Sequence, residues 1–235
     1  MDPRLGRLYS PDNRDRSYPF SMALRPVDLT IPKKIWPLGP VLDQGQTPQC
    51  VAYAWRQWLV SDPMDTIHTD RKQSDPVPHP YIPDDLTPEV IYGEAQAIDG
   101  FPGPHDGTSV RAGVQILSKK DFVKTYLWSS NITDMIAWIL SHGPVVVGVN
   151  WYESMFETKK SGLVSVKGIP VGGHAFIVNG YLSKSRRFLC TNSWGTNWGR
   201  NGQFKIKLED MQRLAYEEWG EVCTAIEKLP DTVSS

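Results

Sequence analysis

The first half of the chain carries apolar residues at helical spacing in four separate segments. In the first of these segments the apolar residues fall on one face, as a period of 3.6 residues requires. Thr87-Pro88 has the form of an N-cap followed by proline at the first helical position, and Gly143-Pro144 has the form of a helix end. The predicted helices span about residues 50–60, 87–100, 109–119 and 133–141.

The pattern changes after residue 144, where β-branched and aromatic residues form short runs separated by turn residues. These runs predict strands at about residues 145–149, 175–181, 188–192, 204–208 and 222–226. Helices followed by strands are typical of an α+β fold. We therefore predict a mainly helical half (residues 41–130) and a β-rich half (residues 131–235), packed as one domain with a cleft between them.

Two segments show neither the helical spacing nor the short apolar runs of strands. Residues 1–40 contain seven prolines and are predicted to form an extended strap over the core. Residues 61–85 are rich in Asp and Pro and are predicted to be a long surface loop. His68, Asp70 and His79 lie in that loop at no recognised metal spacing, so we interpret them as solvated residues and expect no metal site.

The overall charge and composition narrow the function classes. With 235 residues, 40% hydrophobic residues and a net charge of -1, the chain is expected to bury a substantial core and to have no nucleic-acid partner. It has no run of roughly 20 apolar residues, so no membrane partner is expected, and without an apolar leader we expect a cytoplasmic protein. Its three cysteines match neither a disulfide framework nor a zinc site, and reduced thiols are expected.

Three residues have the positions that nucleophilic catalysis by a thiol needs. Cys50 begins a predicted helix, where unpaired N–H groups and the helix dipole stabilise a thiolate. His174 follows Gly172-Gly173 at the expected start of a strand, a suitable place for a base that would hold Cys50 as a thiolate near neutral pH. Asn192 ends the next strand and is able to fix the histidine tautomer, while Trp194 would shield that bond from water.

Taken singly, each of these residues has a plainer interpretation. An isolated cysteine is more often a small buried hydrophobe than a nucleophile. Cys190 and Cys223, in predicted strands, are expected to be core thiols of that kind. Trp194 and Trp198 are expected to pack over the histidine and the core rather than to stack a base or a sugar. The order and spacing of the residues together favour a catalytic site.

Three segments resemble, in order, the signature segments of the papain and cathepsin family of cysteine peptidases. They are Gln44 to Cys50 (QGQTPQC), Gly172 to Tyr181 (GGHAFIVNGY) and Asn192 to Gly202 (NSWGTNWGRNG). The resemblance covers about residues 38–208 and implies a papain-like fold. It also implies a Cys50–His174–Asn192 triad that hydrolyses a peptide or protein substrate without a cofactor.

The same resemblance assigns further roles. Gln44 lies six positions before Cys50, where the family has the glutamine that joins the cysteine N–H in the oxyanion hole. Asp106-Gly107 matches the segment that pairs with a peptide substrate. Gly173 and Trp194 are likewise expected to contact the substrate.

The chain departs from the family around its nucleophile. The usual Cys-Gly-Ser-Cys-Trp is replaced by Thr47-Pro48-Gln49-Cys50-Val51, so the disulfide of the earlier cysteine cannot form and substrate fit is altered. We also expect no long helical propeptide of the kind found in many relatives, and we expect only the first 40 or so residues to be able to cover the cleft. Two alternatives therefore stay open: a papain-like peptide-binding module with little catalysis, and an amidase or acyl transferase with the same Cys-His pair.

Overall fold

The computed structural model describes residues 2–64 and 86–228. The helices are α1 (Cys50–Leu59), α2 (Pro88–Gln96), α3 (Val110–Lys119), α4 (Ile132–Ser141) and α5 (Leu208–Gln212). The strands are β1 (Lys33–Ile35), β2 (Val123–Trp128), β3 (Val145–Tyr152), β4 (Pro170–Leu182), β5 (Arg187–Thr191), β6 (Gln203–Lys207) and β7 (Glu221–Glu227). Short 3-10 segments are η1 (Asn13–Ser17), η2 (Phe20–Met22), η4 (Glu153–Phe156) and η5 (Ser183–Ser185), and a π-helical turn, η6 (Arg213–Glu217), continues α5.

The predicted α+β class is confirmed, and each predicted helix and strand is present with shifted ends. The pattern missed β1, β2 and the helical segment α5–η6. Strand β1 has only three residues, two of them lysines, and the middle of β2 is only partly buried, so neither carries a clear two-residue period. The predicted loop at residues 61–85, with His68, Asp70 and His79, lies almost entirely outside the described residues.

The strands form one antiparallel sheet in the order β2-β7-β3-β4-β5-β6. Strand β4 is the longest, and it pairs with β3 along its first part and with β5 along its last part. Strand β1 also pairs with the end of β4, at Lys33 opposite Leu182. Because β5 already occupies one edge there, β1 extends the edge that β3 leaves free, and the strap is tied into the sheet.

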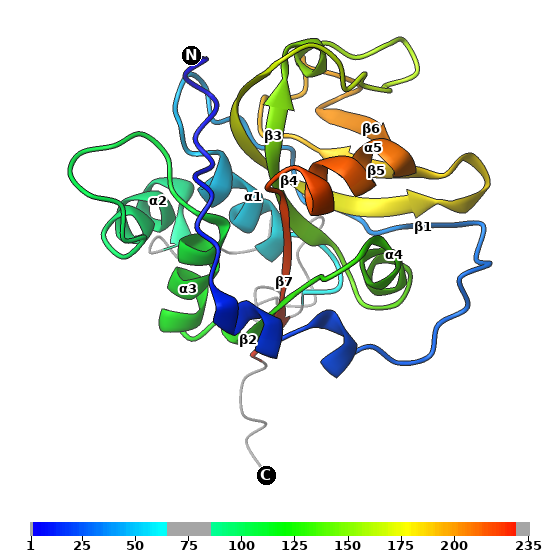
Figure 1. Ribbon diagram of the computed structural model, residues 1–235, viewed down its shortest axis with the longest axis horizontal. Coiled ribbons are helices and arrows are strands. Elements are labelled where there is room, and N and C mark those ends of the chain that lie inside the picture. The colour runs from blue at the N-terminus through cyan, green and yellow to red at the C-terminus, as the bar shows by residue number, and fades with distance from the viewer. Residues whose placement is uncertain (1, 65–85, 229–235) are drawn as a thin grey trace, which may run out of the picture.

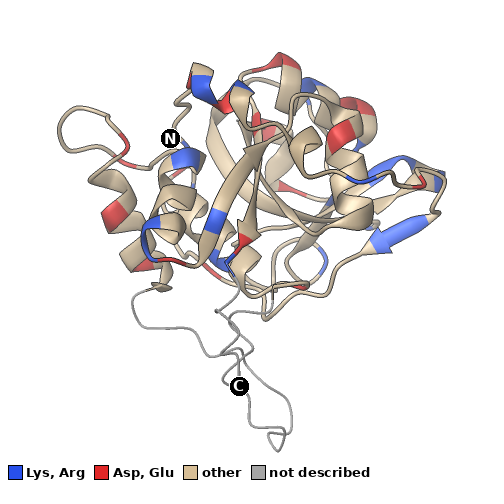
Figure 2. Cartoon of the chain, turned by 90° about the horizontal axis from the view of Figure 1, so that it is seen from below, with Lys and Arg blue, Asp and Glu red and all other residues tan. Residues whose placement is uncertain are grey.

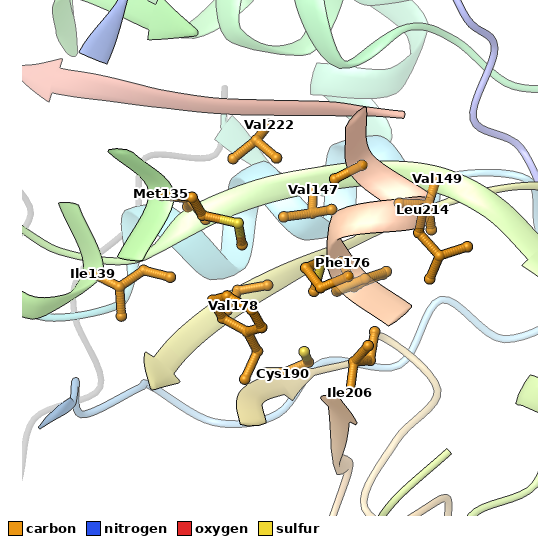
Figure 3. Packing of buried hydrophobic residues seen from close by; sticks show 14 of the residues in the cluster. Met135, Ile139, Val147, Val149, Phe176, Val178, Cys190, Ile206, Leu214 and Val222 are labelled. Atoms are coloured by element: carbon orange, nitrogen blue, oxygen red, sulfur yellow. The ribbon is translucent and has the colours of Figure 1, made fainter. Parts of the chain in front are cut away.

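The sheet is buried on both faces. Alternate residues of β4 point to opposite sides, so Phe176 and Val178 join one hydrophobic cluster while Ala175 and Ile177 join the other. The first cluster includes side chains of α4 and of the segment α5–η6, such as Ile139 and Leu214 (Figure 3). The second cluster packs against α1 and α3, which cover the opposite face. This two-sided burial explains why the strands are nearly continuous apolar runs.

Two tryptophans fix α1 to both halves of the molecule. Trp55 donates from its indole nitrogen to the Val110 carbonyl at the start of α3, over 2.9 Å. Trp58 donates to the Pro144 carbonyl just before β3, over 3.2 Å. Both rings are fully buried. The helix that begins at Cys50 is therefore tied to α3 on one side and to the sheet on the other.

The strap crosses the front of the molecule between these two layers. Figure 1 shows it descending in blue, with α2 and α3 to its left and β3 and β4 to its right, before it turns below α4 toward β1. Basic and acidic residues are interspersed along the chain (Figure 2). Among the described residues, no helix is both long enough and apolar enough to cross a bilayer.

Candidate active site

Cys50 is the first residue of α1, as its sequence position predicts. Gln49 precedes it without capping the helix through its side chain, so the free N–H groups of the first turn remain available. The thiol is fully buried, and this burial raises its pKa. The backbone N–H groups of Ala175, Gly6 and Val51 act in the opposite direction, which places the thiol beside the strand that carries His174.

His174 lies within β4, opposite Val149 of β3, rather than at a strand start, because β4 begins four residues earlier at Pro170. Its Nε2 is 2.7 Å from Oδ1 of Asn192. The Ser193 N–H donates to the same oxygen over 2.9 Å, so that oxygen is an acceptor and His174 Nε2 carries the proton. In the neutral imidazole Nδ1 is then the basic nitrogen, and it has no hydrogen-bond partner among the described residues.

Aromatic rings enclose the imidazole. The rings of Trp151 and Trp194 have their centroids 4.7 Å and 4.8 Å from that of His174. Burial among them lowers the pKa of His174 from 6.5 to about 4, against the opposing effect of the Asn192 hydrogen bond. Burial in the covered site therefore acts against charge on both groups, because it raises the pKa of the Cys50 thiol and lowers that of the His174 imidazole. The thiolate–imidazolium pair stays a prediction.

Gln44 is held in a single orientation. Its Oε1 accepts from the Ser193 hydroxyl over 2.6 Å, and its main-chain N–H donates to the Ser193 carbonyl over 2.8 Å. The amide nitrogen Nε2 consequently faces the other way, where it donates to the Thr47 carbonyl over 2.5 Å and the Arg4 carbonyl over 3.1 Å. Ser193 thus orients both Asn192 and Gln44 at once.

Residues 4–8 of the strap lie between the segment that leads into α3 and strand β4, a place that we call the groove. The Arg7 N–H donates to the Gly173 carbonyl over 3.0 Å, next to His174. On the opposite wall the strap pairs with Thr108, which donates to the Gly6 carbonyl and accepts from the Leu8 N–H, each over 2.9 Å. A Cβ on Gly6 would lie 2.0 Å from the Pro48 carbonyl oxygen, so only glycine allows this close approach over Cys50.

The residues predicted to bind substrate have different surroundings. Gly173 and Trp194 both touch the strap, Gly173 through its carbonyl and Trp194 through the Arg4 guanidinium 4.2 Å above its ring. Gly107 is buried against Gly6, but its own N–H donates to the Tyr92 hydroxyl over 2.9 Å, and the strap pairs with Thr108 instead. Asp106 is exposed.

Four residues of the groove escaped the sequence analysis: Trp151, Ser193, Thr108 and Glu221. Ser193 stood inside a recognised segment, between Asn192 and Trp194, and its serine hydroxyl was the signal that was overlooked. Trp151 and Glu221 come from β3 and β7, whose neighbours across the sheet are far away in sequence. No local pattern distinguishes them, so only the folded chain shows where they lie.

The chain is similar in sequence to known cysteine proteases. Residues 103–220 match the model of a family described as papain family cysteine protease. This match includes His174 and Asn192, whereas Gln44 and Cys50 precede it. Cathepsin B-like cysteine proteinase 4 of Caenorhabditis elegans is 32% identical over 114 residues, which are 46% of this chain and 34% of that protein. The gut-specific cysteine proteinase of the same animal is also 32% identical, over 46% of this chain and 35% of its own length.

These curated relatives are longer proteins, and the match spans about a third of their length. A solved structure covers far more. Xylellain, a cysteine protease from Xylella fastidiosa, superposes with a TM-score of 0.69 at 21% identity over 98% of each chain. Procathepsin L2 proteinase from the Tenebrio molitor larval midgut gives a TM-score of 0.63 at 14% identity, over 94% of this chain and 77% of its own.

Proposed function

The chain belongs to the papain family of cysteine proteases and has the papain-like fold that its sequence resemblance predicted, and from this premise we propose that it is a thiol peptidase. Cys50 is the nucleophile and His174 its acid and base. Asn192 holds the imidazole, and Gln44 with the Cys50 N–H forms the oxyanion hole.

One observation carries this proposal. The Gln44 amide donates to a main-chain carbonyl, that of Arg4, from a peptide segment that lies extended over the buried Cys50. The same segment hydrogen-bonds through its backbone to Thr108 and Gly173 on the two walls. These contacts recognise the main chain rather than particular side chains, which supports an extended peptide as the class of substrate.

The proposed reaction uses these groups in two stages. Cys50 Sγ attacks the carbonyl carbon and passes its proton to His174 Nδ1, while the resulting oxyanion accepts from Gln44 Nε2 and the Cys50 N–H. His174 then gives that proton to the amine nitrogen as the C–N bond breaks, which leaves a thioester. A water deprotonated by His174 attacks the thioester, and Sγ departs with that proton to regenerate the thiol.

The enzyme in this form is latent, because its own strap occupies the groove. The Arg4 carbonyl already takes the Gln44 donor, and residues 4–8 exclude any other peptide from Cys50. The raised pKa of the Cys50 thiol and the lowered pKa of His174 accord with this cover, since burial is the largest cause of both. Displacement of the strap would hydrate the pair and allow the thiolate to form.

The test measures peptide hydrolysis by the full chain that carries Gly6→Val. The valine side chain would collide with the Pro48 carbonyl and displace the strap. We expect hydrolysis in this variant that disappears when Cys50→Ala is added. Under the same conditions a peptidyl epoxide should label Cys50, spare Cys190 and Cys223, and fail to label His174→Ala.

Unchanged hydrolysis after Cys50→Ala would refute the proposal, and tight peptide binding without a detectable thioester by mass spectrometry would favour the peptide-binding module. Products formed with an added amine would instead identify an acyl transferase.

A further inference from the structure

The loop between α2 and α3 carries a histidine whose two ring nitrogens both face acceptors. His105 Nδ1 is 2.9 Å from the Gly103 carbonyl oxygen, and its Nε2 is 3.1 Å from Oδ2 of Asp99. A neutral imidazole has a single N–H, so it would turn a lone pair toward one of these two oxygens. Only the doubly protonated ring satisfies both contacts, and this arrangement therefore favours the imidazolium.

The carboxylate that holds this ring is buried, although the ring itself is partly exposed. The Asp99 side chain is 0% exposed, and that of His105 is 19% exposed. Oδ1 of Asp99 accepts from the Phe101 N–H over 3.1 Å, and Oδ2 also accepts from the Thr108 hydroxyl over 2.8 Å. Asp99 therefore joins the two ends of the loop, and the proton on His105 compensates its buried charge.

The charged side chains that act most strongly on His105 within the described part of the chain are carboxylates. Asp99 is in contact with the ring, and Asp106, the next residue along the chain, attracts the proton through space. The Gly103 carbonyl, followed by Asp99, raises the pKa of His105 above its ordinary 6.5. The geometry and the local charge thus favour the same protonation state.

Helix α2 supports the loop through groups without a charge. Gln96 Nε2 donates to the His105 carbonyl over 2.7 Å, and the Tyr92 hydroxyl accepts from the Gly107 N–H over 2.9 Å. Burial raises the pKa of Tyr92, so its hydroxyl keeps its proton near neutral pH. These contacts do not change with pH in the range in which His105 titrates.

Thr108 is the residue through which this loop reaches the groove. It is fully buried. Its main chain donates to the Gly6 carbonyl and accepts from the Leu8 N–H of the strap, each over 2.9 Å. Its hydroxyl is held by Asp99. The orientation of the Thr108 main chain therefore depends on the same carboxylate that binds the His105 ring.

We propose that Asp99 and His105 form a clasp that positions the main chain of Thr108, and that the clasp is closed only while His105 is protonated. The closed clasp fixes the two hydrogen bonds between Thr108 and the strap. For a peptide substrate the inference rests on the proposed peptidase function, because the substrate main chain would pair with the same wall. Since both residues act through Thr108, they are positioning residues.

The direction of the pH dependence follows from the proton on His105. In an open clasp the ring lies in water with its ordinary pKa of 6.5, whereas the closed clasp raises that pKa. The closed clasp is therefore stabilised in full below about pH 6.5, and this stabilisation is lost as the pH rises through the raised pKa. The strap should be held most firmly in mild acid.

The first experiment measures the clasp in the full chain without any catalysis. Amide hydrogen exchange of Thr108 and Leu8 is followed by NMR at pH 5.5, 7 and 8.5, in the wild type and in His105→Gln. The ratio of the two rates at each pH cancels the effect of pH on exchange itself. At pH 5.5 both amides should exchange roughly three- to tenfold faster in His105→Gln, and the ratio should fall toward about one at pH 8.5.

Two further chains locate the effect. Thr108→Val keeps the shape of the side chain but removes the hydroxyl that Asp99 holds. In this chain the Leu8 amide should lose its dependence on the protonation of His105, while the ring still titrates above its ordinary pKa. His142→Gln removes another partly buried histidine, at the end of α4, and should leave both amides unchanged. Thermal unfolding shows whether each variant remains folded.

The NMR shift of the His105 ring gives its titration directly. A pKa at or below 6.5 in the wild type would overturn the proposal. So would an exchange ratio that is the same at all three pH values. Should His105→Gln prove unstable, Asp99→Asn provides a second test, because it removes the charge and should return the pKa of His105 toward its ordinary value.

The second experiment asks whether the clasp serves the proposed reaction. In the strap-displaced Gly6→Val chain, adding His105→Gln should raise KM for a peptide roughly three- to tenfold at pH 5.5 and leave kcat within about twofold, because only main-chain binding is weakened. The difference in KM should vanish at pH 8.5. Hydrolysis together with a constant exchange ratio would remove the clasp and leave the peptidase function standing. No hydrolysis, together with the expected exchange pattern, would remove the peptidase function and leave the clasp.

Discussion

Cys50 lies on the floor of the groove, whereas Cys190 lies within β5 and Cys223 within β7. All three thiols are free and fully buried, and burial raises the pKa of each. The three thiols differ in the parts of the chain that cover them. Cys190 and Cys223 are enclosed by strands and core side chains, while Cys50 is covered in part by residues 4–8 of the strap. Equal burial therefore does not mean equal reactivity.

The largest expected difference between these thiols is in catalysis. Cys50→Ala should lower peptide hydrolysis by the strap-displaced Gly6→Val chain by at least about 10³-fold, because the nucleophile is lost. Cys190→Ala in the same chain should leave the rate unchanged and cost only about 1 kcal/mol in the free energy of unfolding. The two are compared by initial rates and by urea denaturation. A loss of rate in Cys190→Ala greater than its loss of folded protein would contradict the comparison.

Gln44→Ala should have the next largest effect. It removes the side-chain donor of the proposed oxyanion hole, which generally lowers kcat by about 10²–10³-fold. Ser193→Ala leaves that donor present but removes the hydroxyl that orients it, so a smaller loss is expected. The ratio of kcat between the two variants in the strap-displaced chain is the measurement. Equal losses would show that Ser193 does more than hold Gln44.

The buried imidazole should make the covered protein sensitive to acid. The pKa of His174 is about 4 when folded, below its ordinary 6.5, so the unfolded chain takes up this proton at higher pH than the folded chain. The contribution of His174 to the free energy of unfolding is then complete above about pH 6.5 and is lost as the pH falls toward 4, by about 2–4 kcal/mol.

The check is urea unfolding at pH 7, 5.5 and 4.5 in the wild type and in His174→Gln. Groups common to both chains, such as Glu221 and His142, cancel in the difference between them. As the pH falls, the free energy of unfolding should decrease more in the wild type than in His174→Gln. Parallel pH profiles would show that the imidazole is not held neutral by burial.

The smallest expected effect, and the most specific to the strap, is on alkylation. Gly6→Val should speed the reaction of Cys50 with iodoacetamide by about tenfold or more, since the strap no longer lies against Pro48. Cys190 and Cys223 in the same molecule serve as internal controls. Ser21→Val, an exposed strap position outside the groove, should change none of the three rates. Faster alkylation of all three thiols in Gly6→Val would indicate general unfolding instead.

Some features of this protein follow from local sequence and others do not. The 3.6-residue and two-residue periods predicted the principal helices and strands, because burial of one face imposes those periods on the chain itself. The start of α1 at Cys50 was predictable for the same reason. The segments around Gln44, His174 and Asn192 were recognisable because their residues are adjacent in sequence.

The cover over the site was decided by tertiary structure. Residues 4–8 and Cys50 meet only because Thr108 and Gly173, from opposite halves, both hydrogen-bond to the strap. The pKa of His174 is lowered by burial among rings that include Trp151, which comes from another strand. The Arg7–Glu221 ion pair joins residues at the two ends of the chain. Such long-range contacts depend on which surfaces of the chain pack together, and the spacing of residues along the sequence does not predict that packing.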